Sequence, residues 1–185
     1  MLLQLLIHQP QAVVTIVQKT PVWVWGLASG LAWLGLSQVR DRRTALARVA
    51  VMPVAMLGFA VWGMVSAFGS TQLAEVLGLW LVSAVAMFTL VTVLTPGSGG
   101  ASYDAAKRRF AVPGSWVPLA LILGIFLFKY GVGVELAMQP QLARDTAFAL
   151  PIAAIYGAFN GLFAARAARL LRLVGRPRAA AVAAL

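Results

Sequence analysis

A lysine inside a long apolar run is the first residue whose position in this sequence suggests chemistry. Lys129 lies within residues 117–134, a segment that holds no other charged side chain. A charge at the centre of a membrane-spanning helix costs at least about 2.5–3.5 kcal/mol, so it usually meets a polar partner or a water-filled cavity. The position of Lys129 therefore indicates a candidate polar site.

Three of the five acidic residues, Glu75, Glu135 and Asp145, fall near the ends of apolar runs. Together with Tyr130 they could form an outward-facing pocket with Lys129 at its floor. We take Lys129, Glu135, Glu75, Asp145 and Tyr130 as candidate ligand-binding residues for a small solute or ion. The alternative is that the long lysine stem carries its amine to the membrane interface and that the carboxylates are solvated helix ends.

Several classes of site are excluded or disfavoured by residue type. The chain has no cysteine, and its one histidine, His8, cannot form a multi-histidine metal site within one protomer. No nucleophile motif and no phosphate-binding loop is present. We therefore assign no catalytic residue, no metal and no cofactor, and favour a non-enzymatic role. A lipid-modifying enzyme with Lys129, Glu135 or Asp145 as acid or base is the least favoured alternative.

The composition identifies the solvent of the protein. Of the 185 residues, 61% are hydrophobic and 11% are charged, whereas globular proteins have roughly 45–50% apolar residues. A bilayer is therefore the expected partner. The net charge of +10 indicates orientation and contact with anionic lipid rather than binding of nucleic acid.

Apolar runs predict an all-α membrane protein with five transmembrane helices in one domain. A helix needs about 20 residues to cross roughly 30 Å of hydrocarbon. The short connections favour antiparallel neighbours in a single bundle. The spans are expected at about residues 21–38, 49–68, 72–94, 116–134 and 146–165.

Three segments outside these spans have their own patterns. Residues 1–19 are interrupted by His8-Gln-Pro-Gln11, and predict an interfacial helix or, alternatively, an extension of the first span. In residues 101–115, alternation at Phe110 and Val112 predicts a short cytoplasmic β-like hairpin. Residues 175–185 are expected to form a flexible tail.

Small residues four positions apart let helices approach closely. Gly26 and Gly30 have this spacing in the first expected span, and Gly157 and Gly161 have it in the last. We interpret them as helix-packing positions. They favour a protein that acts through helix contacts, as a homo-oligomer or with a membrane partner protein.

Basic residues predict the orientation. Twelve of the fifteen fall on one side of the five-span scheme, which the positive-inside rule assigns to the cytoplasm. The N-terminus is then outside and the C-terminus inside. The twelve are Arg40, Arg42, Arg43, Arg48, Lys107, Arg108, Arg109, Arg166, Arg169, Arg172, Arg176 and Arg178.

Three parts of the chain share one resemblance. They are the start of the chain, Met1-Leu-Leu-Gln-Leu-Leu-Ile-His8, the segment Tyr103-Asp-Ala-Ala-Lys-Arg-Arg-Phe-Ala-Val-Pro-Gly-Ser-Trp116, and the pattern Lys129-Tyr130-x-x-Gly133. With Thr20-Pro-Val-Trp-Val-Trp25, they resemble a family of small, uncharacterised bacterial inner-membrane proteins, a domain of unknown function. The resemblance covers most of the chain. It implies a multi-pass protein of the bacterial inner membrane and implies no activity.

Overall fold

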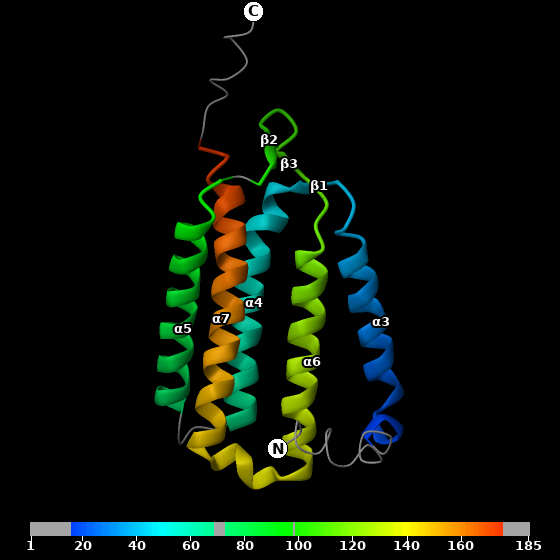
Figure 1. Cartoon of the computed structure of the whole chain (residues 1–185), viewed down its shortest axis with the longest axis vertical. Helices are drawn as coiled ribbons and strands as arrows, with labels where there is room; N and C mark the ends of the chain where they lie inside the picture. Colours follow the sequence, from blue (N-terminus) through cyan, green and yellow to red (C-terminus); the bar gives the residue numbers. More distant parts are fainter. Residues whose placement is uncertain (1–15, 69–72, 98, 176–185) are drawn as a thin grey trace, which may run out of the picture. The chain divides into compact units, whose positions relative to one another are not determined.

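The computed structural model describes residues 16–68, 73–97 and 99–175 (Figure 1). These residues form two compact units. Unit 1 contains the described residues up to Arg40 and those from Ser115 to Asp145, and unit 2 contains the others. Each unit is described by itself. Most of the expected interfacial helix over 1–19, and the expected tail after Gly175, lie outside the described residues.

Unit 1 is built from α3 (Val22–Leu36), α6 (Val117–Met138) and the 3-10 helix η1 (Pro140–Arg144). Gly35 of α3 is buried against Leu119 of α6, where an added Cβ would lie 3.0 Å from the Leu119 Cα. The Ser115 amide donates to the Gln38 carbonyl at 3.1 Å. These contacts join the end of α3 to the start of α6.

The length of α3 departs from the five-span expectation. Its 15 residues extend about 22 Å at roughly 1.5 Å per residue, short of the ~30 Å hydrocarbon layer. Four described helices are long and apolar enough to cross a membrane, namely α4, α5, α6 and α7. The protein is thus mostly helical with four candidate spans. Whether α3 makes a fifth crossing stays a prediction.

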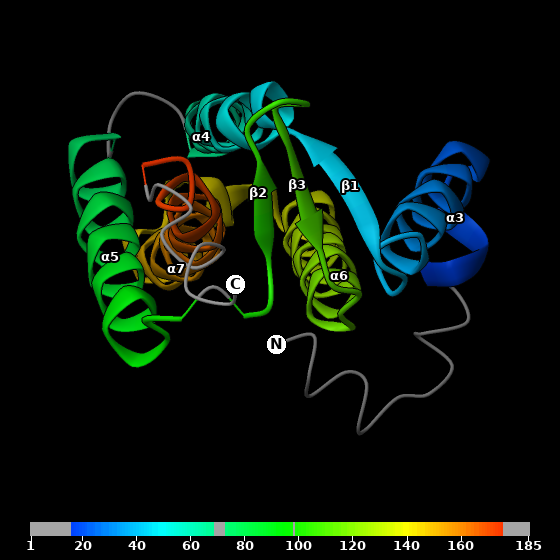
Figure 2. The ribbon, with the colours of Figure 1, turned by 90° about the horizontal axis from the view of Figure 1, so that it is seen from above.

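Unit 2 holds three of those helices, α4 (Leu46–Phe68), α5 (Leu73–Leu94) and α7 (Thr146–Leu171). Helices α5 and α7 lie side by side in Figures 1 and 2. An added Cβ at Gly157 would overlap the Trp80 carbonyl oxygen, and one at Gly161 would overlap that of Ala84. Because both pairs advance in the same direction, the two helices run parallel.

A three-stranded antiparallel sheet caps one end of unit 2. Its strands are β1 (Arg42–Ala45), β2 (Ser102–Asp104) and β3 (Arg109–Val112). Figure 2 shows β3 between the other two, in agreement with the order β1-β3-β2. Sequence analysis expected two strands here and missed β1, which pairs Arg42 with Val112.

The β2–β3 connection is a short turn stabilised by the side chain of Asp104. The Lys107 amide donates to Asp104 Oδ1 at 3.2 Å, and Arg108 has a φ of 49°. Strand pairing places Tyr103 opposite Phe110, with ring centroids 4.9 Å apart. Phe110 is fully buried. One face of this small sheet therefore has an apolar anchor.

Candidate functional site

The predicted polar pocket draws most of its residues from unit 1. Lys129 and Tyr130 are neighbours in the second half of α6, where Lys129 is exposed and Tyr130 is half-buried. The Tyr130 hydroxyl forms a hydrogen bond with the Thr20 hydroxyl, and the Tyr130 ring stacks on Phe126. These contacts tie α6 to the residues that precede α3.

The carboxylates expected at the rim of that pocket lie in different surroundings. Because α6 continues to Met138, Glu135 is inside the helix rather than at its end. It is half-buried, and six residues of helix place it about 240° around the axis from Lys129. The two side chains therefore leave α6 on different faces. Asp145 is the exposed C-cap residue of η1, and Glu75 is exposed in the first turn of α5, in unit 2.

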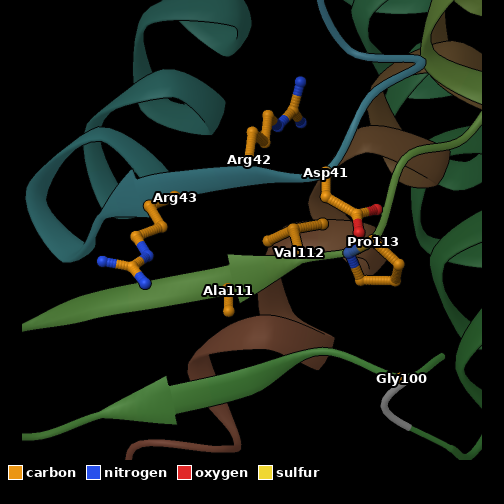
Figure 3. A pocket seen from close by; sticks show the side chains of 7 residues that line it. All are labelled: Asp41, Arg42, Arg43, Gly100, Ala111, Val112 and Pro113. Atoms are coloured by element: carbon orange, nitrogen blue, oxygen red, sulfur yellow. The ribbon is translucent and has the colours of Figure 1, made fainter.

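A depression lies beside the sheet of unit 2 (Figure 3). It is open, has a volume of about 290 Å³, and is lined by Asp41, Arg42, Arg43, Gly100, Ala111, Val112 and Pro113. Two cationic side chains from consecutive positions of β1 therefore border one cavity. Figure 3 shows that Arg42 and Arg43 leave the strand in different directions.

The two faces of the sheet differ in burial. Arg42 has the same orientation in β1 as Thr44, whose partner in β3 is Phe110. Burial follows this alternation, since positions 42 and 44 are half-buried while 43 and 45 are exposed. Arg42 is thus on the buried face of the sheet, beside the apolar anchor. Arg43 is on the exposed face.

Other arginines of unit 2 interact electrostatically with Arg42 or with one another. Burial and, secondarily, repulsion by Arg48 lower the pKa of the Arg42 guanidinium from its ordinary value. At the end of α7, the half-buried Arg166 is repelled by Arg169 and by Arg42. The Arg169 guanidinium lies against Gly99, next to Gly100 of the depression. These four arginines, Arg42, Arg48, Arg166 and Arg169, are called the arginine cluster.

The two carboxylates of the sheet region accept hydrogen bonds from backbone amides. Asp41 Oδ1 accepts a hydrogen bond from the Gly114 amide at 2.7 Å, and Asp104 Oδ1 accepts one from Lys107. In the described part of the chain, the electrostatic partners of Arg42 and Arg166 are other arginines, and neither forms an ion pair with a carboxylate. Among the described residues, the cluster is therefore a concentration of positive charge without a carboxylate counter-ion.

Sequence reasoning had used these arginines for orientation only. Their positions in the chain gave no sign of a common site, because Arg42 and Arg166 are separated by three long helices. The missing information was β1, since its pairing with β3 is what fixes the direction of the Arg42 side chain. A strand containing two consecutive arginines lacks the apolar alternation that predicts strands.

Comparison with known proteins yields a family and no close relative of known activity. No curated protein and no solved structure matches this chain significantly. The resemblance to an uncharacterised domain family is confirmed at the level of the family. A family model described as "Family of unknown function (DUF6622)" matches residues 1–182, and the chain belongs to that family.

Proposed function

We propose that this multi-pass protein resides in the bacterial inner membrane and acts without catalysis, through contacts between its helices and those of a second copy. An accessory subunit of a larger complex is the other form of the same idea. The supporting observation is a contrast between glycine pairs. Gly157 and Gly161 lie against the α5 backbone, whereas nothing in the described residues lies within 4 Å of a Cβ at Gly26 or Gly30.

The glycine pair without a packing partner among the described residues, Gly26 and Gly30, is on α3, the shortest of the described apolar helices. At 15 residues, α3 is shorter than a typical membrane span. Its Gly26 and Gly30 form a small-xxx-small step, a surface on which two identical helices can cross closely about a two-fold axis. Trp23, Trp25 and Trp33 are exposed on the same helix. A second copy of α3 fits this surface because the step is complementary to itself.

The test is the oligomeric state of the full-length protein in lipid nanodiscs or mild detergent. Gly30→Leu places a large side chain at the proposed crossing, and should weaken dimerisation by about 1–2 kcal/mol, roughly tenfold in the dissociation constant. Gly58→Leu is the matched control, because Gly58 of α4 also has open space around it but has Val54 and Trp62 four residues away.

The measurement is the monomer–dimer equilibrium, by single-molecule photobleaching at a series of protein-to-lipid ratios. A dimer that Gly58→Leu disrupts as strongly as Gly30→Leu would contradict an α3 interface. A wild-type protein that stays monomeric at every ratio would reject the homo-oligomer itself.

A second candidate is a channel, carrier or receptor for a small solute or ion around Lys129. The hydrogen bond between Tyr130 and Thr20 favours it, because polar groups then gather in the turn of α6 that holds Lys129. Lys129→Met removes the charge while keeping an unbranched apolar stem. Solute flux into proteoliposomes should then fall to background while the protein keeps its helical circular dichroism. Unchanged flux of the transported solute would exclude this role for Lys129.

A further inference from the structure

The positive charges of the arginine cluster repel one another at the sheet end of unit 2. Arg42 on β1 is repelled by Arg48 on α4 and repels Arg166 on α7, so like charges from three elements act on one another through Arg42. Arg42 and Arg166 are half-buried, so water screens their charges less than it screens exposed charges. Partly buried like charges are costly unless a counter-ion joins them.

Orientation in a membrane does not account for this arrangement. Positive charge on a cytoplasmic loop serves the positive-inside rule wherever it sits, and the exposed Lys107, Arg108 and Arg109 meet that need. Arg42 instead lies on the buried face of the sheet, with Phe110 and Val112. A role in topology would be served equally well by an exposed side chain.

We propose that the guanidinium groups of Arg42, Arg48 and Arg166 bind a phosphate group at the sheet end of unit 2, with Arg169 at the edge of the site. Guanidinium groups are planar donors that match phosphate oxygens with paired hydrogen bonds. One bound phosphate replaces the repulsion among the arginines with attraction to a shared anion. Sheet, α4 and α7 are then held together by one ligand.

The depression beside β1 offers a route to the site. Arg42 lines it, together with Val112 and Gly100, and Arg169 lies against the adjoining Gly99. Asp41 also borders the depression, so an anion must pass or displace this exposed carboxylate. Its hydrogen bond to the Gly114 amide holds one carboxylate oxygen on the backbone.

Two sources can supply the phosphate, the head group of a phospholipid or a free phosphate ion. The arginines lie near the termini of apolar helices, with Arg48 in the first turn of α4 and Arg166 near the end of α7. Head groups lie at this level of a membrane, and juxtamembrane basic clusters attract anionic lipids. We therefore expect the phospholipid to be the ligand.

The test titrates the delipidated full-length protein in detergent with phosphatidylglycerol, and follows bound lipid by native mass spectrometry. Arg42→Gln combined with Arg166→Gln should weaken binding of phosphatidylglycerol roughly tenfold or more, because two charge-assisted contacts are lost. Lys107→Gln combined with Arg109→Gln is the matched control. It removes the same charge from exposed positions of the β2–β3 hairpin, and should leave affinity within about twofold of wild type.

Competition between phosphatidylglycerol and inorganic phosphate distinguishes the sources. Phosphatidylglycerol binding that millimolar phosphate does not displace assigns the site to the lipid. Displacement by phosphate assigns it to the free ion. If the two double variants weakened phosphatidylglycerol binding equally, the lipid would be responding to the overall surface charge of the protein. That result would overturn the proposal. Unchanged binding in the Arg42/Arg166 variant would overturn it as well.

Folding is checked by the thermal midpoint in detergent without added lipid. Because the substitutions remove charges that repel one another, the thermal midpoint of the glutamine variant without lipid should equal that of wild type or exceed it. The rise in thermal midpoint that phosphatidylglycerol produces in the wild type should be absent from this variant. If the glutamine variant does not fold, Arg42→Lys with Arg166→Lys keeps the charge, loses the planar donors, and should still bind more weakly. Wild-type affinity in the lysine variant would overturn the proposal. The readout is independent of α3, so loss of the proposed dimer would leave it unaffected.

Discussion

At two positions of α7, the packing of unit 2 depends on the absence of a side chain. A Cβ at Gly157 would lie 3.0 Å from the Trp80 carbonyl carbon, and one at Gly161 would lie 3.0 Å from that of Ala84. The obstructing atoms are helix backbone, which cannot rotate away as a side chain can. Ser83, between the two contacts, donates from its Oγ to the Ala154 carbonyl at 2.6 Å. The parallel helix pair is therefore fixed by both close packing and a polar contact.

This close packing predicts different effects for the same substitution at two glycines. Gly161→Ala should lower the free energy of unfolding by about 1–3 kcal/mol, because α5 must move away. Gly78→Ala in α5 meets no described atom within 4 Å, and should be neutral or raise stability by up to about 1 kcal/mol through helix propensity. The measurement is unfolding in mixed micelles with increasing SDS, followed by circular dichroism. Equal stability of the two variants would mean that α5 and α7 are not in backbone contact.

At the scale of elements, local patterns predicted helices well and paired strands poorly. Apolar runs placed α4 and α5 within a few residues of their observed bounds, because lipid-facing helices must be apolar along their length. The third strand depended on pairing Arg42 with Val112, far apart in sequence. No local periodicity of Arg42–Ala45 indicates that partner.

The candidate sites differ in the same way: local sequence features are predictable, and features that depend on distant pairing are not. Lys129 stood out because a charge in an apolar run is a local anomaly, and α6 does contain it. Its relation to Glu135 depended on where α6 ends, and that helix continues to Met138 rather than 134. The arginine cluster required the fold, since Arg42 of β1 and Arg166 of α7 come within electrostatic reach of each other only in three dimensions. Gly35, buried by Leu119, was missed because it has no glycine or alanine four residues away.

At the scale of the whole molecule, the parallel direction of α5 and α7 constrains how the chain crosses the membrane. Two parallel spans require a return crossing between the end of the first and the start of the second. Among the described residues of that interval, α6 is the helix long and apolar enough to make it. Helix α4 begins at the sheet, where the Leu46 amide donates to the Arg108 carbonyl. Because β2 follows the end of α5 and α7 runs parallel to α5, we expect the sheet and the end of α7 to lie on one side of the membrane.

This topology can be mapped with single cysteines, because the native chain has none. Variants Lys107→Cys, Gln141→Cys, Arg172→Cys and Lys19→Cys all place the thiol at exposed positions. A membrane-impermeant maleimide applied to intact bacterial spheroplasts should label Cys variants at Gln141 and Lys19. Those at Lys107 and Arg172 should react only after permeabilisation, because the positive-inside rule keeps the arginine-rich side in the cytoplasm.

Lys19 decides whether α3 completes a fifth crossing. Its Cys variant should react from outside together with the Gln141 variant if α3, though only 15 residues long, tilts little or thins the bilayer around it. Labelling only after permeabilisation would leave four crossings and place the residues before α3 on the cytoplasmic side. Labelling of the Lys107 and Gln141 variants from the same face would contradict the crossing by α6 itself. If that shared face were the outer one, the arginine cluster would lose its expected exposure to the anionic cytoplasmic leaflet.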